Sequence, residues 1–394
     1  MKVRLPLIIR KNIVFCINID WEDPMAKIGS FEFSLRELGG SLGDLGTLLP
    51  LAVGYITVCG IDPAGMLVFM GLANILTGII YRLPMPIEPM KVLAVMAIAQ
   101  AWTPDKVFMS AFAMGVTWLI LGFSGAITWI ASRTPQAVIR GIQLSLGLLL
   151  AMQGFRMIDG AWILAGLSIL LILVLRDNRF APASLVLVLG GVLLMAFRGD
   201  LSQIQSVTFT LPPLHPLRLE LFWPSMRDGG FSQIPLTATN AVIATSALIS
   251  RYWPDRSVSA RHLSINMGVM NLLGPFIGGI PLCHGAGGLA GQYYYGARTG
   301  GANVIEGFLE ILLGIFFAGH IATIFRSFPM AIVGAMMIMV GVEMAKFTRS
   351  VRGPGEWSVV AVTVGFSLYL NMAAGFAAGL AAAWIIAGHG KTGN

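Results

Sequence analysis

Apolar runs separated by Gly, Pro and charged residues dominate the pattern of this chain. Most runs approach the roughly 20 apolar residues that a bilayer-spanning helix needs. They form two sets of seven on either side of a polar stretch near 198–230. The predicted segments are 38–59, 64–81, 88–102, 107–131, 137–155, 161–175 and 181–197, then 231–250, 263–279, 285–296, 302–325, 329–345, 356–371 and 373–389.

The third segment of each set is short and follows a proline-containing stretch. PMPIEPMK at 84–91 precedes one, and PLCHGAGGLAGQYYYGARTG at 281–300 contains the other. A helix that begins inside a bilayer presents unpaired N–H groups and a partial positive charge, an arrangement suited to an anion. Two such interruptions at corresponding positions are the best sequence indication of a transporter's substrate site. We therefore predict half-helices at segments 3 and 10.

Equal spacings indicate that the two sets are related. The run PQAV at 135–138, followed by Gly147, matches PMAI at 329–332, followed by Gly341, at a constant offset of 194 residues. Because seven is odd, the second set enters the membrane from the opposite side, and the repeat is inverted. The predicted fold is an all-α polytopic membrane protein of 14 transmembrane segments in a 7+7 inverted repeat.

Composition narrows the class of protein. With 56% hydrophobic residues, 11% charged residues and a mean hydropathy of +0.78, the chain is not expected to be a soluble domain. Cys16, Cys59 and Cys283 are too scattered to indicate a disulfide framework, and no metal or cofactor is expected. The net charge of +7 includes no basic cluster long enough to follow nucleic acid. The sequence shows no nucleophile paired with a base and no phosphate-binding loop, so an enzyme is not expected.

The basic residues also predict a topology. Nineteen of the 26 Lys and Arg fall on one side of the predicted membrane and six on the other, a bias that places both termini in the cytoplasm. Arg256 and Lys346 are then inside and Arg218 outside. The expected location is the cytoplasmic membrane of a prokaryote. The divisions are a cytoplasmic segment 1–33, a first repeat 34–200, an extracytoplasmic linker 201–228 and a second repeat 229–390, with no regulatory C-terminal domain.

An acidic residue opens the first segment. ELGGSLGDLGTLLP at 37–50 places Asp44 about two turns into an apolar helix, where burying a carboxylate costs about 2.5–3.5 kcal/mol on insertion scales. Two interpretations are open: a proton or cation site that organises a substrate pocket, or a structural acid that accepts hydrogen bonds from broken backbone. Ser41 and Thr47 share its helix face, although each hydroxyl is equally consistent with a bond to its own backbone.

Further polar side chains accompany the two interruptions. Glu88 and Lys91 are three residues apart and either pair with each other or supply a proton acceptor and a positive charge to the cavity. His284 is either an oxyanion donor or a structural histidine.

Two later segments carry polar residues as well. Glu306 and Glu310, one turn apart in segment 11, are proton-carrier candidates after Asp44 and Glu88. The eighth segment has a polar stripe that is either interhelical hydrogen bonding or cavity lining. The stripe consists of Gln233, Thr237, Thr239 and Asn240.

Taken together, ELGGSLGDLGTLLP, PMPIEPMK and PLCHGAGGLAGQYYYGARTG resemble the molybdate transporter family, a branch of the sulfate-permease superfamily, over about residues 34–390. The resemblance implies a core domain of segments 1–4 and 8–11, a gate domain of the rest, and a ligand between the starts of the third and tenth helices. With the residues considered above, the candidate substrate-binding set is Ser41, Asp44, Thr47, Glu88, Lys91, Gln233, Thr237, Cys283, His284, Gly285, Ala286, Gly287 and Gly288.

The function that follows is secondary active transport of a tetrahedral oxyanion, above all molybdate. Moving two negative charges inward against 100 mV costs about 4.6 kcal/mol, which favours proton- or sodium-coupled uptake. Sulfate and tungstate share the charge and shape of molybdate and stay open as substrates. A nucleobase permease and an anion channel are the alternatives. The expected partners are the oxyanion and membrane lipid, and a homodimer is left open.

Overall fold

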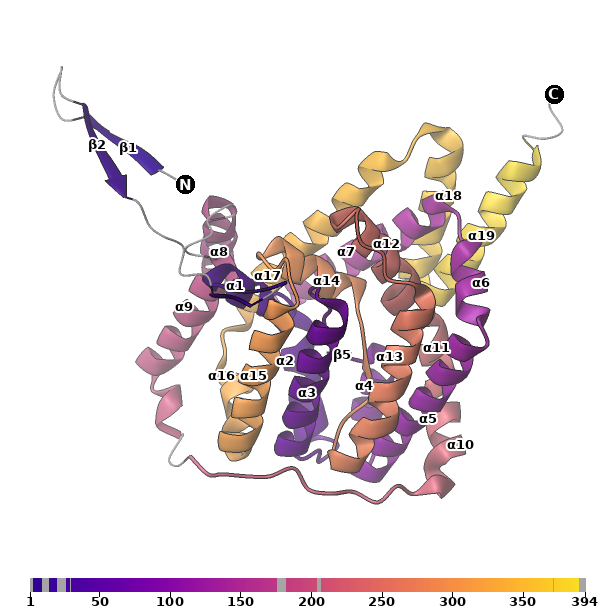
Figure 1. Ribbon diagram of the computed structural model, residues 1–394, viewed down its shortest axis with the longest axis horizontal. Coiled ribbons are helices and arrows are strands. Elements are labelled where there is room, and N and C mark those ends of the chain that lie inside the picture. Colours follow the sequence, from indigo (N-terminus) through magenta and orange to yellow (C-terminus); the bar gives the residue numbers. More distant parts are fainter. Residues whose placement is uncertain are drawn as a thin grey trace.

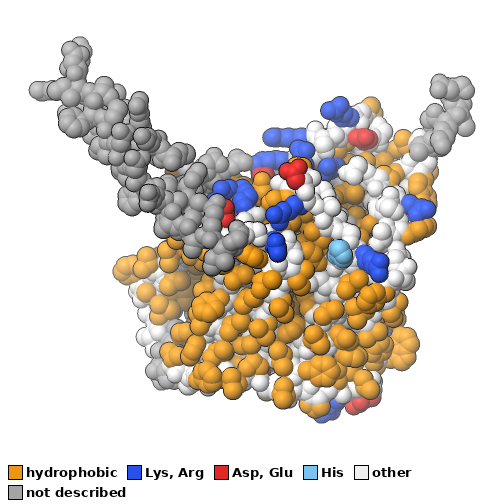
Figure 2. Space-filling view, viewed as in Figure 1, with side chains coloured by type: hydrophobic (Ala, Val, Ile, Leu, Met, Phe, Trp, Pro, Cys, Tyr) orange, Lys and Arg blue, Asp and Glu red, His pale blue; other side chains and the backbone are white. Residues whose placement is uncertain are grey.

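The computed structural model describes residues 30–175, 182–203, 207–370 and 372–389, together with the backbone of three short strands before residue 30. Hydrophobic side chains cover most of the face shown in Figure 2, and basic side chains gather at its upper end. Within the described residues, four helices are long and apolar enough to cross a membrane, or five when one bent pair counts as a single span. The other predicted segments form shorter or interrupted helices.

The first predicted set is helical, and two of its members are broken. Segment 1 divides at 42–44, and segment 4 divides at Gly125, whose φ of +73° is typical of glycine. The elements are α1 (Leu35–Ser41), α2 (Leu45–Thr57), α3 (Pro63–Tyr81), β5 (Glu88–Pro89), α4 (Lys91–Ala99), α5 (Pro104–Phe123), α6 (Ala126–Ser132), α7 (Gln136–Ile158), α8 (Trp162–Val174) and α9 (Ala183–Arg198).

The second set begins earlier than predicted. Segment 8 starts at Phe222 and runs helically to Tyr252 through π-helical stretches at Met226–Gly230 and Ala238–Ala244. Segment 11 bends by 87° after Phe316. The elements are α10 (Phe222–Ser225), α11 (Phe231–Thr237), α12 (Thr245–Tyr252), α13 (Ala260–Leu273), β6 (Leu282–Cys283), α14 (Ala286–Tyr294), α15 (Gly301–Phe316), α16 (Ile321–Ser327), α17 (Met330–Ala345), α18 (Gly353–Tyr369) and α19 (Met372–His389).

Short strands correct the prediction of an entirely helical chain. β1 (Val3–Ile8) pairs antiparallel with β2 (Val14–Ile19), and β3 (Ala26–Ile28) pairs with β4 (Phe31–Phe33). β5 and β6 pair deep in the molecule. Prolines hold the stretch before α4 extended, so its free backbone groups need a partner outside their own segment.

Helices of the first set pack against helices of the second set in three main pairs. α3 packs on α15, α13 packs on α5, and α7 packs on α17. Gly71 and Gly307 meet at the α3–α15 contact, and Gly147 and Gly341 meet at the α7–α17 contact, where a Cβ on either glycine would collide with the carbonyl oxygen of the other. Small residues of this kind allow close helix packing in membranes, where lipid competes for apolar contacts.

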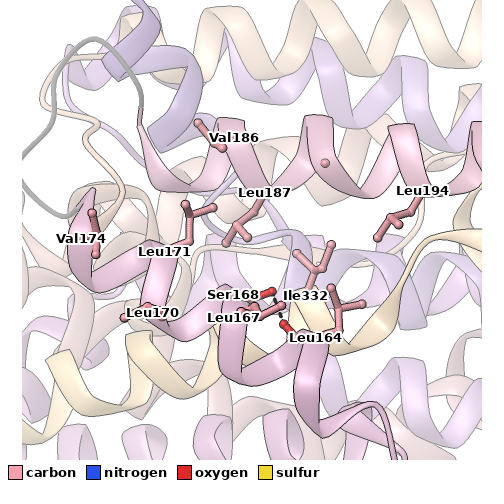
Figure 3. A pocket seen from close by; sticks show the side chains of 11 residues that line it. Leu164, Leu167, Ser168, Leu170, Leu171, Val174, Val186, Leu187, Leu194 and Ile332 are labelled. Atoms are coloured by element: carbon pink, nitrogen blue, oxygen red, sulfur yellow. Dashed lines mark hydrogen bonds between the residues drawn. The ribbon is translucent and has the colours of Figure 1, made fainter.

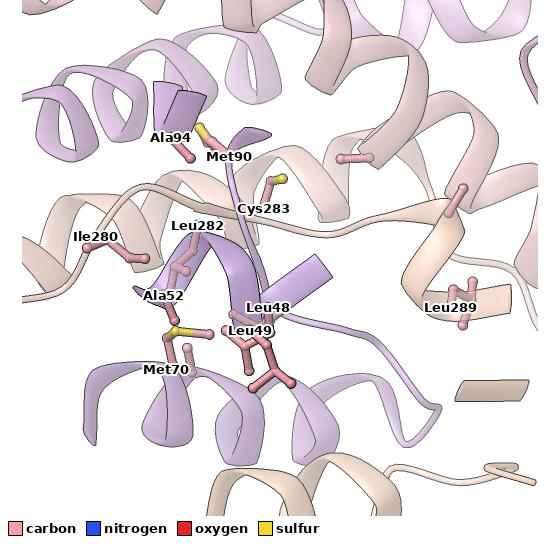
Figure 4. Packing of buried hydrophobic residues seen from close by; sticks show 14 of the residues in the cluster. Leu48, Leu49, Ala52, Met70, Met90, Ala94, Ile280, Leu282, Cys283 and Leu289 are labelled. Atoms are coloured by element: carbon pink, nitrogen blue, oxygen red, sulfur yellow. The ribbon is translucent and has the colours of Figure 1, made fainter. Parts of the chain in front are cut away.

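The hydrophobic core surrounds the extended stretches. Leu48 and Leu49 from α2 lie near Met70 of α3, and Leu282 of β6 lies nearby (Figure 4). These side chains are at most 6% exposed. Burying each of them contributes about 1.5–3 kcal/mol, so this core fixes the strands that precede both half-helices.

The two ends of the molecule carry different parts of the chain. α1 begins and α19 ends at one end, whereas the stretch from 207 to 221 runs along the other (Figure 1). That stretch is anchored by the N–H of His215, which donates to the carbonyl of Phe276 at 2.9 Å. At the same end, Asp228 accepts hydrogen bonds from Lys106 at 2.6 Å and Arg227 at 2.9 Å.

Candidate functional site

A short antiparallel pairing brings the starts of α4 and α14 together. Glu88 lies opposite Cys283 and Pro89 opposite Leu282, and the N–H of Met90 donates to the carbonyl of Pro281 at 2.9 Å. The two interrupted segments predicted from sequence therefore lie side by side, although almost two hundred residues separate them. α4 and α14 run away from this pairing as separate half-helices.

Side chains of the eighth segment cap both half-helices. The amide oxygen of Gln233 accepts from the N–H groups of Val92 at 2.8 Å and Leu93 at 3.2 Å, and that of Asn240 accepts from Ala286 at 3.2 Å. The two amides are seven residues apart, which places them on one side of the helix two turns apart. The polar stripe thus satisfies backbone donors that the half-helices leave open.

The other members of the stripe support the cap on α4. Thr237 accepts a hydrogen bond from the amide nitrogen of Gln233 at 2.7 Å, which fixes which end of the amide faces α4. Among the described residues, Thr239 bonds only to carbonyls of its own helix. The stripe was predicted as either interhelical hydrogen bonding or cavity lining. The contacts of Gln233 and Asn240 with the half-helices are interhelical, whereas the threonine contacts lie within one helix.

A small cavity lies at the first turn of α14. One wall consists of Gly43, Asp44, Gly287 and Gly288, and the other consists of Leu150, Met336, Met337 and Val340. Its volume of about 20 Å³ is enough for about one water molecule. A Cβ on Gly287 would meet only the Leu150 methyl carbons, at 3.2 and 4.0 Å. An oxyanion of five heavy atoms therefore fits only when the two walls move apart.

Asp44 lies elsewhere than predicted. It occupies the break between α1 and α2 rather than a position two turns into one helix. The break allows the backbone at Gly43 to approach α14, because a Cβ there would come within 2.6 Å of the Gly291 carbonyl carbon. The buried Asp44 carboxylate is 3.5 Å from the amide nitrogen of Gln292, which also donates to Glu306 at 2.9 Å.

Of the two hydroxyls predicted beside Asp44, that of Ser41 makes a local hydrogen bond. Ser41 donates to the carbonyl of Leu38 at 2.8 Å, in keeping with its local interpretation. The side chain of Thr47 lies outside the described residues.

Glu88 and Lys91 form an ion pair next to the cavity. The Lys91 Nζ is 2.7 Å from Glu88 Oε2, and the Glu88 side chain is only 1% exposed. The carboxylate lies against α14, since a Cβ on Gly285 would come within 2.5 Å of Oε2. Within the described part of the chain, Oε1 of Glu88 has no hydrogen-bond partner. A carboxylate of the protein itself thus lies at the helix start predicted to bind an anion.

Cys283 and His284 belong to the scaffold around the site. The Cys283 side chain is buried in the hydrophobic core (Figure 4). His284 is fully buried, with Nδ1 3.3 Å from the carbonyl oxygen of Pro86 and its ring edge-on to Tyr81 at 6.0 Å. Neither residue lines the small cavity. Among the described residues the buried Nε2 of His284 has no hydrogen-bond partner, so both interpretations of this histidine stay open.

A buried chain of amides extends from the site, and sequence reasoning missed it. Asn74 donates to Glu310 at 2.8 Å and accepts from Asn303 at 2.8 Å, while Asn303 also binds both backbone groups of Met85. The signal was present in the sequence, because an amide in an apolar segment needs partners. Gln292, which connects Asp44 to Glu306, was missed in the same way.

A larger pocket elsewhere on the molecule differs in chemistry from this site. This pocket, between α8, α9 and Ile332 of α17, has a volume of about 550 Å³ and an apolar lining (Figure 3). Its single hydroxyl, Ser168, already donates to the carbonyl of Leu164 at 2.7 Å. This surface cannot hold an anion. Among the described residues, no group of three or more His, Cys, Asp and Glu could hold a metal ion.

Fold comparisons define the class. The structure resembles that of SLC26A9, with a TM-score of 0.60 and 14% identity over 90% of this chain; the chain spans 65% of that protein. It also resembles the transmembrane domain of the cyanobacterial bicarbonate transporter BicA, with a TM-score of 0.55 and 16% identity over 88% of this chain and 97% of that one. The chain therefore shares the fold of these two membrane proteins.

Sequence comparisons identify the family. Residues 36–150 and 225–344 match the family described as "Molybdate transporter of MFS superfamily". Molybdate transporter 1 of Arabidopsis thaliana is 31% identical over 89% of this chain and 87% of its own length. Molybdate transporter 1 of Chlamydomonas reinhardtii is 27% identical over 89% and 91%. The chain belongs to the molybdate transporter family, as its three motifs predicted. These relatives come from a plant and an alga, so a prokaryotic location stays a prediction.

Proposed function

We propose that this protein is a secondary active transporter of a tetrahedral oxyanion, molybdate, and that it works by alternating access. The observation that carries this proposal is the small cavity at the first turn of α14, where Gly287 and Gly288 add no side chain to a helix start between two sets of helices. The molybdate transporters among its relatives support the choice of substrate.

Charge balance supports coupling to a cation. The start of α14 contributes about half a positive charge, and the Glu88 carboxylate already neutralises Lys91. A dianion therefore enters with most of its charge uncompensated unless a proton or sodium ion accompanies it. A proton on Glu88 would release Lys91 toward the substrate, and a proton on Asp44 would remove a negative charge from the cavity wall.

Besides Glu88, three buried carboxyl groups are candidates to carry that proton. Asp44 and Glu306 share the amide of Gln292, and Glu310 is held by Asn74. Carboxyl groups buried this closely favour sharing a proton over both being ionised. We assign the first role to Asp44, because it alone among these acids lines the cavity, with Glu88, Glu306 and Glu310 as the other candidates.

The reciprocal helix packing supports a 7+7 inverted repeat. α3 and α13 hold corresponding places in the two sets, as do α5 and α15, and each member of one pair packs on a member of the other. The cavity wall with Asp44 and Gly287 then belongs to a core domain. The wall with Leu150 and Met336 belongs to a gate domain, and movement between the domains would open the site to either side.

Transport into proteoliposomes tests the proposal. Labelled molybdate should accumulate under an imposed proton or sodium gradient, and tungstate and sulfate should compete in proportion to their affinity. Absence of accumulation under both gradients, or inhibition by uracil but not by the oxyanions, would exclude it. A current larger than any carrier turnover would instead identify a channel.

A further inference from the structure

A second and larger cavity opens at the end of the molecule where α14 terminates. Its volume is about 570 Å³, in the range of ligand pockets. Five basic side chains and one acidic side chain line it. They are Arg140, Arg251, Lys346, Arg349, Arg352 and Glu343. The lining therefore carries four more positive than negative charges.

The positive charge of this basic cavity is largely uncompensated. Its acid, Glu343, is 2.6 Å from Lys346. In the stretches of chain that the structure describes, Arg251, Arg349 and Arg352 form no side-chain ion pair. Arg140 lies close enough to Arg251 for the two charges to oppose each other. Like charges gathered in this way raise the free energy of the empty cavity, and a bound anion relieves it.

Two buried donors at the cavity also lack partners. Nε of Arg140 and the hydroxyl of Tyr252 are buried, and neither has a hydrogen-bond partner among the described residues. Leaving such a group unsatisfied destabilises the empty cavity. The Tyr252 ring stacks on Tyr293 at 3.7 Å, which holds the hydroxyl in place. Both residues line the cavity, so these unsatisfied donors lie in its wall.

The basic cavity joins the same helices that form the small one. Along α17, Met336 and Val340 line the small cavity, and Glu343 and Lys346 line the basic one about one turn further on. Arg140 comes from α7 and Lys346 follows α17, whereas Arg251 and Tyr293 come from α12 and α14. An anion bound here would connect the two sides that must separate for the small cavity to open.

We propose that the basic cavity is a second anion site, for a phosphate-bearing polyanion, and that occupancy holds this end closed and slows transport. The excess of four positive charges matches a polyphosphate group better than a dianion, and the volume exceeds what one tetrahedral oxyanion fills. The source is either a soluble polyphosphate or the phosphorylated headgroup of an anionic lipid. The slowing of transport rests on the proposed function, whereas binding does not.

Binding of inorganic triphosphate to the purified full-length protein tests the site without any transport. Arg251→Gln/Arg349→Gln should weaken binding at least about tenfold, because two charge-assisted hydrogen bonds to the anion are lost. Arg261→Gln is the matched control, since Arg261 is an exposed arginine on α13 outside the cavity, and should bind as the parent protein does. Equal weakening in both variants would overturn the proposal.

Three further arms identify the ligand. Nanodiscs of phosphatidylcholine with a phosphorylated anionic lipid should block triphosphate binding if the headgroup is the natural occupant, and pure phosphatidylcholine should not. If neither triphosphate nor that lipid binds, the proposal fails. If molybdate binds the cavity as tightly as triphosphate, the cavity is part of the substrate path and the proposal also fails. Triphosphate inside proteoliposomes should slow uptake by the parent protein more than by the double variant.

Discussion

The starts of α4 and α14 are related by position and yet have different environments. At α4, the amide of Gln233 occupies two backbone N–H groups, and Lys91 pairs with Glu88 on the first turn. At α14, one N–H is capped by Asn240, and Gly287 faces the small cavity without a side chain. The comparison supports our proposal that one half-helix start stabilises the site and the other receives the substrate.

The largest expected effect comes from filling the α14 start. Gly287→Leu should abolish molybdate uptake, because its side chain would occupy a cavity of about 20 Å³ where the oxyanion meets backbone N–H groups. Uptake and binding by the purified variant provide the measurement, with thermal stability as the folding check. The matched control is Val92→Leu at the corresponding position of α4, which should retain uptake. Equal loss in both variants would remove the distinction between the two starts.

The second prediction concerns the role of Asp44 in coupling transport to protons. Asp44→Asn should lose accumulation driven by a pH gradient and keep downhill exchange of molybdate, because the amide cannot carry a proton. Counterflow and gradient-driven uptake in the same vesicles separate the two activities. Loss of both activities would support the structural role instead. Retained accumulation would pass the role of carrier to Glu88, Glu306 or Glu310.

The effects on stability of replacing Glu88 and Lys91, the ion pair at the start of α4, should not be additive. Lys91→Gln should leave the buried Glu88 carboxylate without its counter-charge beside α14, at a cost of about 3–5 kcal/mol. The double variant Glu88→Gln/Lys91→Gln should be more stable than Lys91→Gln alone, as measured by thermal unfolding in detergent. If the double variant is instead less stable, Glu88 is held at α14 by something other than Lys91.

The two amide caps predict a smaller difference. Gln233→Ala should cost about 2 kcal/mol in stability because two buried N–H groups lose their acceptor, and Asn240→Ala about 1 kcal/mol because one does. Denaturant unfolding gives the comparison. The order should reverse only if the contact at 3.2 Å to Ala286 matters more than both contacts made by Gln233.

Much of this comparison could be predicted from the sequence, because its signals are local. Proline and glycine interruptions marked both half-helices. Gly147 and Gly341, which share the offset used to relate the two sets, contact each other between α7 and α17, a contact that the sequence did not predict. Which half-helix start is capped by side chains and which faces the small cavity could not be predicted. It depends on which side chains reach each helix start, and Gln233 is 141 residues away from Val92 in the chain.

The position of Asp44 was missed for a related reason. An apolar run with glycines is equally compatible with one long helix and with two short helices joined at a break. Only the approach of α14 to Gly43 selects the break. Asn74 and Asn303 likewise carry no local motif, and their role follows from contacts between segments far apart in sequence.

The last prediction concerns the side of the membrane on which each half-helix ends. It is tested by labelling and does not depend on transport activity. If the repeat is inverted, α4 and α14 end at opposite faces. Arg256→Cys and Lys346→Cys should then react with an impermeant maleimide from the cytoplasm, and Arg218→Cys from outside, in a background without Cys16, Cys59 and Cys283. The Arg218 side chain is 61% exposed and pairs with Asp105 at the surface, so its loss should cost less than about 1 kcal/mol. Labelling of Arg256→Cys and Arg218→Cys from the same face would break the inverted-repeat proposal. The two half-helix starts would then no longer be related by symmetry, and their different environments would need no common origin.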